Sequence, residues 1–301
     1  MRRKRRAGAL EARAPQPSIT RSPAMRASFK ASRLLNTAAA TLAASVLTDS
    51  AAEHYRASFH NRVMFVAPAV SAAAMATATA PVLGARGLSA LSRAVFAGSV
   101  VTGVVGFGFH VTNVSRRIGG WKSTNVLYGA PIAAPLAITL AGLVGLAASH
   151  MTRSTAASHD ERVPAHTGNG AAVALGGLAA VGLAGTSLEA GALHFRGAFQ
   201  NRFMYAPVTI PPIAAATLAT AVLTRSPKAR LAAGKLLRLT AWLGVAGIAF
   251  HAWGVQRRMG GWSNWRQNLL AGPPLPAPPA FTGLALAGLA ALELLDAERT
   301  R

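Results

Sequence analysis

The sequence carries one set of polar motifs twice. The run HYRASFHNRVM at 54–64 returns as HFRGAFQNRFM at 194–204, and residues 109–121 match residues 250–262 at eight of thirteen positions. These matches include a histidine, a pair of arginines and a Gly-Gly-Trp sequence. Most of the matching residues are polar or special, so a chance likeness between apolar segments does not explain them. The chain is therefore predicted to be a tandem duplication that carries a paired site.

Long apolar segments place this duplication in a membrane. Hydrophobic residues make up 51% of the chain and charged residues only 13%, and the runs of Ala, Leu, Val and Gly are long enough to cross a hydrocarbon core of about 30 Å. Each copy offers four such segments, at 34–53, 63–84, 91–112, 131–150, 171–193, 203–224, 232–253 and 276–295. The sequence predicts an all-α membrane protein with eight transmembrane helices, as a tandem duplication of a four-helix unit.

Polar segments divide the chain into five predicted parts. These are a basic disordered cytoplasmic tail (1–33), a first four-helix transmembrane repeat (34–150), a polar cytoplasmic linker (151–170), a second four-helix repeat (171–296) and a C-terminal tail (297–301). The N-terminal segment aligns with a mid-chain segment, which argues against a cleaved signal peptide. With four spans in each copy, both copies enter and leave on the same side, so a pseudo-twofold axis along the membrane normal is expected.

The distribution of Lys and Arg predicts the orientation. With residues 1–24 set aside, 14 basic residues fall on the side of the two termini and 10 on the other side, which favours cytoplasmic termini. The Arg-, Ala- and Gly-rich composition suits a bacterial cytoplasmic membrane. Eight of the ten basic residues on the outer side belong to the duplicated motifs. Topology does not explain them, so we interpret them as functional.

Several function classes are excluded by what the sequence lacks. It has no cysteine, which excludes disulfides, iron–sulfur clusters and c-type haem attachment. Much of the net charge of +22 lies in the N-terminal tail, which carries ten Lys or Arg residues against one acid. No nucleic-acid-binding pattern accompanies this charge, so nucleic acid is not an expected partner. No hydrolase elbow, zinc-protease motif or phosphate loop occurs. We predict no catalytic residues.

Carboxylates lie within the first span of each copy. Asp49, Glu53 and Arg56 fall on one helical stripe, and Glu189 with Arg196 repeats the outer pair. Carboxylates at such depth are costly unless they are paired or functional. We expect internal ion pairs between Asp49 and Arg56 and between Glu189 and Arg196, with a proton relay as the alternative.

The third span carries a histidine below two glycines. Gly103, Gly106 and His110 share one helix face, and the second copy repeats the pattern with His251. The glycines indicate either close helix packing or a groove for a flat ligand. A haem b held by His54 and His110, with a second haem held by His194 and His251, is one hypothesis.

Guanidinium groups near these histidines suggest another ligand class, because their planar forks match carboxylates and phosphates. The asparagines in the set can also cap the second span, and the tryptophans suit the headgroup belt. The candidate ligand-binding residues are His54, Arg56, Asn61, Arg62, His110, Arg116, Arg117, Trp121, His194, Arg196, Asn201, Arg202, His251, Arg257, Arg258 and Trp262.

Three functions therefore stay open after the sequence is read. The first is the binding or movement of an anionic small molecule, and the second is a haem-carrying redox subunit that works with a partner protein. The third is a membrane anchor or assembly partner without a ligand. All three require contact with the lipid bilayer, and none implies a metal site apart from the haem iron.

Overall fold

The computed structural model describes residues 23–85, 89–129, 131–160 and 170–299. Within these ranges the regular secondary structure is helical, with no strand. The long helices are α1 (Pro23–Arg56), α2 (Val66–Val82), α3 (Ser89–Ser115), α5 (Leu136–Asp160), α6 (Ala171–Arg196), α7 (Ala206–Thr224), α8 (Pro227–Gln256) and α10 (Pro279–Arg299). The short ones are η1 (Arg62–Phe65), α4 (Ser123–Tyr128), η2 (Arg202–Tyr205), η3 (Gly261–Asn264) and α9 (Trp265–Ala271). The all-α prediction is confirmed.

Six helical segments among the described residues are long and apolar enough to cross a membrane. They are Arg62–Val82, Ala90–Ser115, Ala171–Arg196, Arg202–Thr224, Pro227–Gln256 and Pro279–Arg299. Their apolar side chains also face outward: Val101 is 62%, Leu188 77% and Trp242 71% exposed. Contact of these apolar side chains with lipid tails costs no free energy, whereas their contact with water does. The chain is therefore a multi-pass membrane protein.

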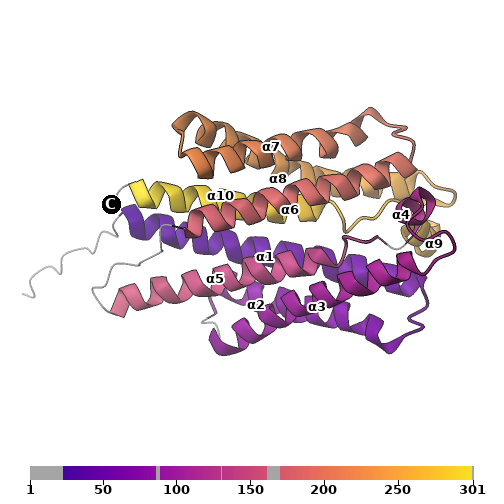
Figure 1. The fold of residues 1–301 in the computed structure, drawn as a ribbon, viewed down its shortest axis with the longest axis horizontal. Coiled ribbons are helices and arrows are strands. Elements are labelled where there is room, and N and C mark those ends of the chain that lie inside the picture. The colour runs from indigo at the N-terminus through magenta and orange to yellow at the C-terminus, as the bar shows by residue number, and fades with distance from the viewer. Residues whose placement is uncertain (1–22, 86–88, 130, 161–169, 300–301) are drawn as a thin grey trace, which may run out of the picture.

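Two predicted spans do not meet the same measure. Helix α1 carries charged residues toward both of its ends, and the apolar part of α5 is shorter, at Leu136–Met151. Both helices nevertheless run alongside the six apolar segments (Figure 1). The count of eight spans therefore stays a prediction.

The helices form two groups of four. In the first half of the chain, α1 packs on α2, α2 on α3, α3 on α5, and α5 on α1; in the second half, α6, α7, α8 and α10 follow the same cyclic order. The two groups lie side by side along a common long axis (Figure 1). Consecutive long helices within each group thus run up and down as in a four-helix bundle, with α4 and α9 inside the two longest connections.

The α1–α10 pair joins the two halves more extensively than any other contact between them. The helices approach closely because Gly283 has no side chain. A Cβ placed there would lie 2.6 Å from Leu42 Cγ and 3.1 Å from the backbone oxygen of Ala38. Small residues commonly permit such close approach in membrane helices. The core lies along this seam and consists mainly of alanine and leucine side chains.

Two boundaries differ from the sequence prediction. Helix α1 begins at Pro23, so residues 23–33 of the predicted disordered tail are helical, and Ala31 is fully buried. Helix α5 continues to Asp160, so half of the predicted linker extends a helix. Polar composition alone does not end a helix whose residues have adequate helical propensity. The rest of that tail and residues 161–169 lie outside the described residues.

Three ion pairs hold the end of the bundle that carries the C-terminus, called the C-terminal end below. Lys30 of α1 lies 2.6 Å from Glu293. Arg225, which follows α7, lies 3.1 Å from Glu298, and Arg230 of α8 pairs with Asp296. All three carboxylates belong to α10. The last turns of α10 are thus fastened to helices of both halves.

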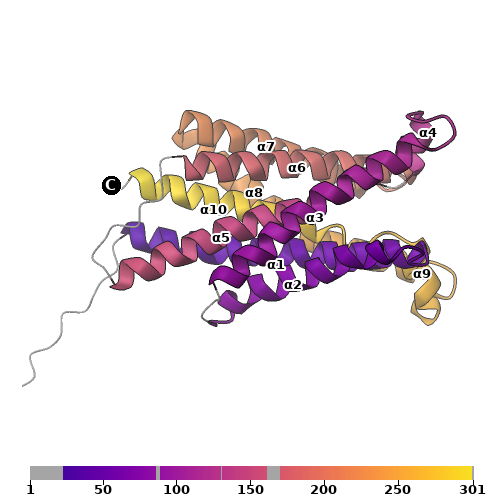
Figure 2. The same cartoon turned by 60° about the horizontal axis from the view of Figure 1, so that its bottom comes forward.

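The opposite end, called the loop end below, carries α4 and α9 (Figure 1). The two short helices lie on opposite sides of it (Figure 2). Helix α4 from the first half contacts α6 of the second, and α9 from the second half contacts α1 of the first. Each half therefore places its loop against the first long helix of the other half.

Candidate functional site

A histidine closes the hairpin after the first long helix of each half. The ring Nδ1 of His54 lies 2.5 Å from the backbone oxygen of Met64, and Nδ1 of His194 lies 2.7 Å from that of Met204. A carbonyl oxygen only accepts hydrogen bonds, so Nδ1 carries the proton and donates in both cases. The hairpin of each half is thus tied by one imidazole.

Aromatic stacking shapes the same hairpins. Phe59 stacks on Phe65 with ring centroids 4.3 Å apart, and Phe199 stacks on Tyr205 at 4.6 Å. Phe59 and Phe199 adopt positive φ angles of 43° and 45°, which is unusual for residues with a side chain. The stack and the edge-on contact of Phe59 with His54 hold this conformation.

In the repeated Asn-Arg dipeptide, the asparagine has a structural role. Asn61 is the N-cap of η1 and its Oδ1 accepts a hydrogen bond from the Val63 amide at 3.0 Å. Asn201 caps η2 in the same way, through the Phe203 amide at 3.0 Å. These contacts match the capping interpretation of both asparagines. The neighbouring arginine in each dipeptide is exposed.

A second histidine in each half holds the loop that precedes the fourth long helix. Nδ1 of His110 in α3 donates to the backbone oxygen of Pro131 at 2.7 Å. Nδ1 of His251 in α8 donates to that of Pro274 at 2.6 Å. Each bond ties the loop to the histidine helix, and the Pro274 oxygen also accepts from the Ala277 amide at 3.3 Å.

The histidines come together in two pairs. His54 is close enough to His110 for their charges to interact, and His194 and His251 are related in the same way. Because each Nδ1 donates to a carbonyl, the neutral ring leaves its Nε2 lone pair available. Each half therefore presents two imidazoles of fixed tautomer, all four of them half-buried.

The glycine face next to the third-helix histidine is filled by protein. A Cβ on Gly103 would lie 2.1 Å from Thr139 Oγ1 and 2.7 Å from the Pro135 oxygen. One on Gly244 would lie 2.3 Å from Thr282 Oγ1. The fourth long helix of each half thus occupies the groove, as close helix packing requires.

The filled groove bears on the haem hypothesis. A porphyrin needs an open face on which to lie, and the space over Gly103 and Gly244 belongs to Thr139 and Thr282. With the helices packed in this way no space is left for a haem against the glycines of α3 and α8, and haem binding by the two histidine pairs stays a prediction. Among the described residues, no group of three or more His, Asp or Glu side chains is arranged to hold a metal ion.

The Gly-Gly-Trp turn that follows each histidine helix depends on its glycines and on an asparagine. Both glycines of each turn have positive φ, between 49° and 87°, which glycine adopts without strain. The Asn125 amide donates to the backbone oxygens of Ile118 and Gly120, and the Asn268 amide bonds the matching pair in the second half. Trp121 and Trp262 stay exposed beside the turns, as headgroup-belt residues do.

The eight motif arginines are exposed at the loop end. Arg56 forms an ion pair with Glu53. Among the described residues the other seven have no carboxylate within ion-pair distance: Arg62, Arg116, Arg117, Arg196, Arg202, Arg257 and Arg258. Guanidinium groups that are not neutralised by the protein are available to an anion from outside.

The ion pairs expected for the deeper carboxylates do not form. Arg56 bonds Glu53 rather than Asp49, because a residue three positions away is a closer helical neighbour than one seven positions away. Arg196 does not pair with Glu189, and its guanidinium carbon instead lies 5.4 Å from the ring centroid of Tyr128. Asp49 and Glu189 instead interact electrostatically with each other, which places the carboxylates of the two halves near one another.

Two aromatic–guanidinium contacts across the halves were missed by sequence reasoning. Tyr128 of the first loop accepts Arg196 of α6, and Arg266 of the second loop lies 5.6 Å from the ring centre of Tyr55 in α1 and bonds its hydroxyl. The repeated motifs give no signal for them, because the position that aligns with Tyr128 is an alanine and the one that aligns with Arg266 is a serine.

Comparison with known proteins adds no relative. No protein-family model, no curated protein and no solved structure matches the chain. The site is therefore defined by its geometry alone: two pairs of half-buried imidazoles beneath a set of exposed guanidinium groups, at one end of a multi-pass membrane protein.

Proposed function

We propose that this chain binds a carboxylate- or phosphate-bearing group at two equivalent His/Arg sites on the outer face of a bacterial cytoplasmic membrane. The single observation that carries the proposal is the set of seven motif arginines without a carboxylate partner. Exposed charges of one sign at one surface give it a positive potential, which attracts an anion from solution.

The equivalence of the two sites rests on tandem duplication of a four-helix unit with eight spans. The histidine–carbonyl bonds, the Asn caps and the glycine contacts recur at matching positions in both halves. An even number of spans in each unit puts both sites on one side, around an axis along the membrane normal. The basic C-terminal end then faces the cytoplasm, with both termini.

The histidines complete each proposed site. With Nδ1 committed to a carbonyl, a neutral imidazole can only accept through Nε2, whereas a protonated one donates from it. An anion at the guanidinium groups favours the protonated ring, so binding of the anion and of a proton assist each other. Movement of the anion across the membrane is not required by any contact at the loop end.

Titration of detergent-purified protein with inorganic phosphate and, separately, with succinate tests the proposal. We expect a saturable rise in melting temperature with at least one of them. In the variant Arg117→Gln with Arg258→Gln the affinity falls about tenfold, since each lost fork removes roughly one strong charge-assisted bond. Lys228→Gln, an exposed charge at the C-terminal end, is the matched control and keeps the response.

Three outcomes would contradict the proposal. If neither anion changes the melting temperature, the loop end has only a scaffolding role and the protein is an anchor or assembly partner. If the Arg117/Arg258 variant responds like the wild type, the sites lie elsewhere. A Soret band in the purified protein would return the four histidines to haem, in a position other than the filled glycine face.

A further inference from the structure

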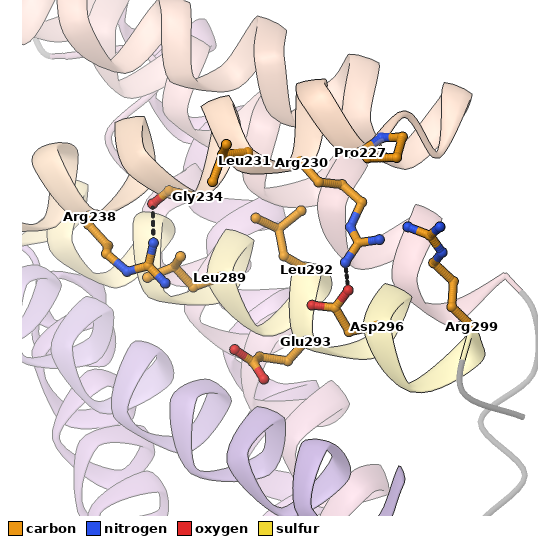
Figure 3. Close-up of a pocket in the computed structure, with 10 residues that line it drawn as sticks. All are labelled: Pro227, Arg230, Leu231, Gly234, Arg238, Leu289, Leu292, Glu293, Asp296 and Arg299. Carbon is orange, nitrogen blue, oxygen red and sulfur yellow. Dashed lines mark hydrogen bonds and ion pairs between the residues drawn. The ribbon is translucent and has the colours of Figure 1, made fainter. Parts of the chain in front are cut away.

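A cavity of about 310 Å³ lies between α8 and α10 at the C-terminal end, far from the His/Arg sites. Figure 3 shows it with its lining side chains. Two groups of residues form its walls. The charged ones are Arg230, Arg238, Arg299, Glu293 and Asp296, and the apolar ones include Leu231, Leu289 and Leu292.

The carboxylates of this cavity are already neutralised. Asp296 pairs with Arg230 across the gap between the two helices (Figure 3). The Glu293 carboxylate points away from α8 in the same view and lies 2.6 Å from Lys30 of α1. Neither acid is therefore available to balance further cations in the cavity.

Two arginines remain without an acidic partner among the described residues. The Arg238 guanidinium donates to the backbone oxygen of Gly234 at 3.1 Å, which leaves its charge in place. Arg299 lies close enough to Arg230 for the two charges to repel. Figure 3 places Arg238 at one end of the cavity and Arg299 at the other. In addition, Nε of Arg230 is buried with no hydrogen-bond partner.

The rest of the cavity is apolar and faces the membrane. Leu231 is 63% exposed, and Gly234 leaves space where a side chain would otherwise stand. The cavity follows the first turns of α8, which starts at Pro227, so it lies where a spanning helix emerges from the hydrocarbon. A ligand that fits must join an anionic group to a hydrocarbon chain.

We propose that this cavity binds the phosphate of an anionic membrane phospholipid headgroup, with the start of an acyl chain against the leucines. Basic pockets between membrane helices hold lipid headgroups in this manner, because the charge attraction and the apolar contact reinforce each other. Free inorganic phosphate shares the head chemistry and leaves the leucine surface uncovered. The proposed occupant is therefore the lipid.

Melting of detergent-purified protein in the presence of three probes tests the assignment: phosphatidylglycerol, phosphatidylcholine and inorganic phosphate. Because inorganic phosphate is also a proposed ligand of the loop end, the three probes are compared in the variant Arg117→Gln with Arg258→Gln. There phosphatidylglycerol is expected to raise the melting temperature and the other two are not. In Arg238→Gln with Arg299→Gln its apparent affinity falls about fivefold for each arginine removed. Lys235→Gln removes an exposed charge from the same helix outside the cavity and keeps the response.

A second variant separates the cavity from its charge. A Cβ on Gly234 would meet Arg238 Nη1 at 3.4 Å and Leu292 Cδ1 at 3.8 Å, so Gly234→Leu fills the space while every charge remains. Leucine also has the higher helix propensity, which preserves the fold. The response to phosphatidylglycerol is expected to disappear in this variant.

The proposal is overturned if, in the Arg117/Arg258 variant, inorganic phosphate raises the melting temperature as much as phosphatidylglycerol does, which would mean an ion site only. It is also overturned if the Arg238/Arg299 and Gly234→Leu variants respond like the wild type. The Arg117/Arg258 variant of the loop end is expected to keep the lipid response. Loss of the response there alone would move the lipid to the His/Arg sites, so the two proposals fail separately.

Discussion

The two ends of this bundle use charge in opposite ways. At the C-terminal end, each of the three paired α10 carboxylates has a cationic partner on another segment of the chain. At the loop end, only one of the eight motif arginines is in an ion pair among the described residues, with Glu53. The loops there are held by hydrogen bonds from histidine and asparagine side chains to backbone oxygens. Every α10 acid at the first end is thus in an ion pair that holds α10 to the rest of the bundle, whereas within the described ranges seven of the eight motif arginines at the second end have no such pair.

The largest test of this contrast is at the Arg225–Glu298 pair. Glu298 has a side chain only 7% exposed, so Arg225→Ala leaves a buried carboxylate without compensation. We expect the free energy of unfolding to fall by about 3 kcal/mol, measured by chemical denaturation in detergent. The double variant Arg225→Ala with Glu298→Leu should recover most of the loss. Equal stability of wild type and Arg225→Ala would mean that ion pairs do not fasten this end.

A smaller effect is expected at a site of close helix packing in the middle of α3. In Gly103→Ala the new methyl group collides with Thr139 and the Pro135 oxygen, which should cost about 1–3 kcal/mol. Gly108→Ala is the matched control on the same helix, because nothing lies within 4 Å of its Cβ. It should be neutral or stabilising by up to about 1 kcal/mol. Melting temperatures that fall equally in both variants would rule out the close contact.

The smallest effect should come from the one ion pair of the loop end. Arg56 and Glu53 are both substantially exposed, so solvent and side-chain entropy offset their attraction. Arg56→Gln should change the free energy of unfolding by about 0.5 kcal/mol or less, with little dependence on salt. A loss comparable to that of Arg225→Ala would show that both ends rely on ion pairs and would remove the contrast.

Sequence reasoning reached the elements whose cause is local. Asn61 and Asn201 cap short helices because a side-chain oxygen reaches an amide two residues away, and the Gly-Gly turns need the positive φ that only glycine takes easily. The approximate limits of the long helices follow from the apolar runs in the same way.

The contacts between helices could not be predicted from the sequence. A face with glycines such as Gly103 reads the same whether a helix or a ligand covers it, and here Pro135 and Thr139 do. The sequence predicted an ion pair between Arg196 and Glu189 on the same helix, yet the Arg196 guanidinium lies over the ring of Tyr128 in the other half. The acids of α10 have partners on three other segments of the chain, and only the packing of those segments brings them together.

The crossed loops have a mechanical consequence. Helix α4 rests on α6 and α9 rests on α1. At the loop end, each group of four helices is therefore held by a loop of the other group. A rocking motion of one group against the other would have to break both of these loop contacts together. Separation of the halves at this end therefore has to break the Arg196–Tyr128 and Arg266–Tyr55 contacts.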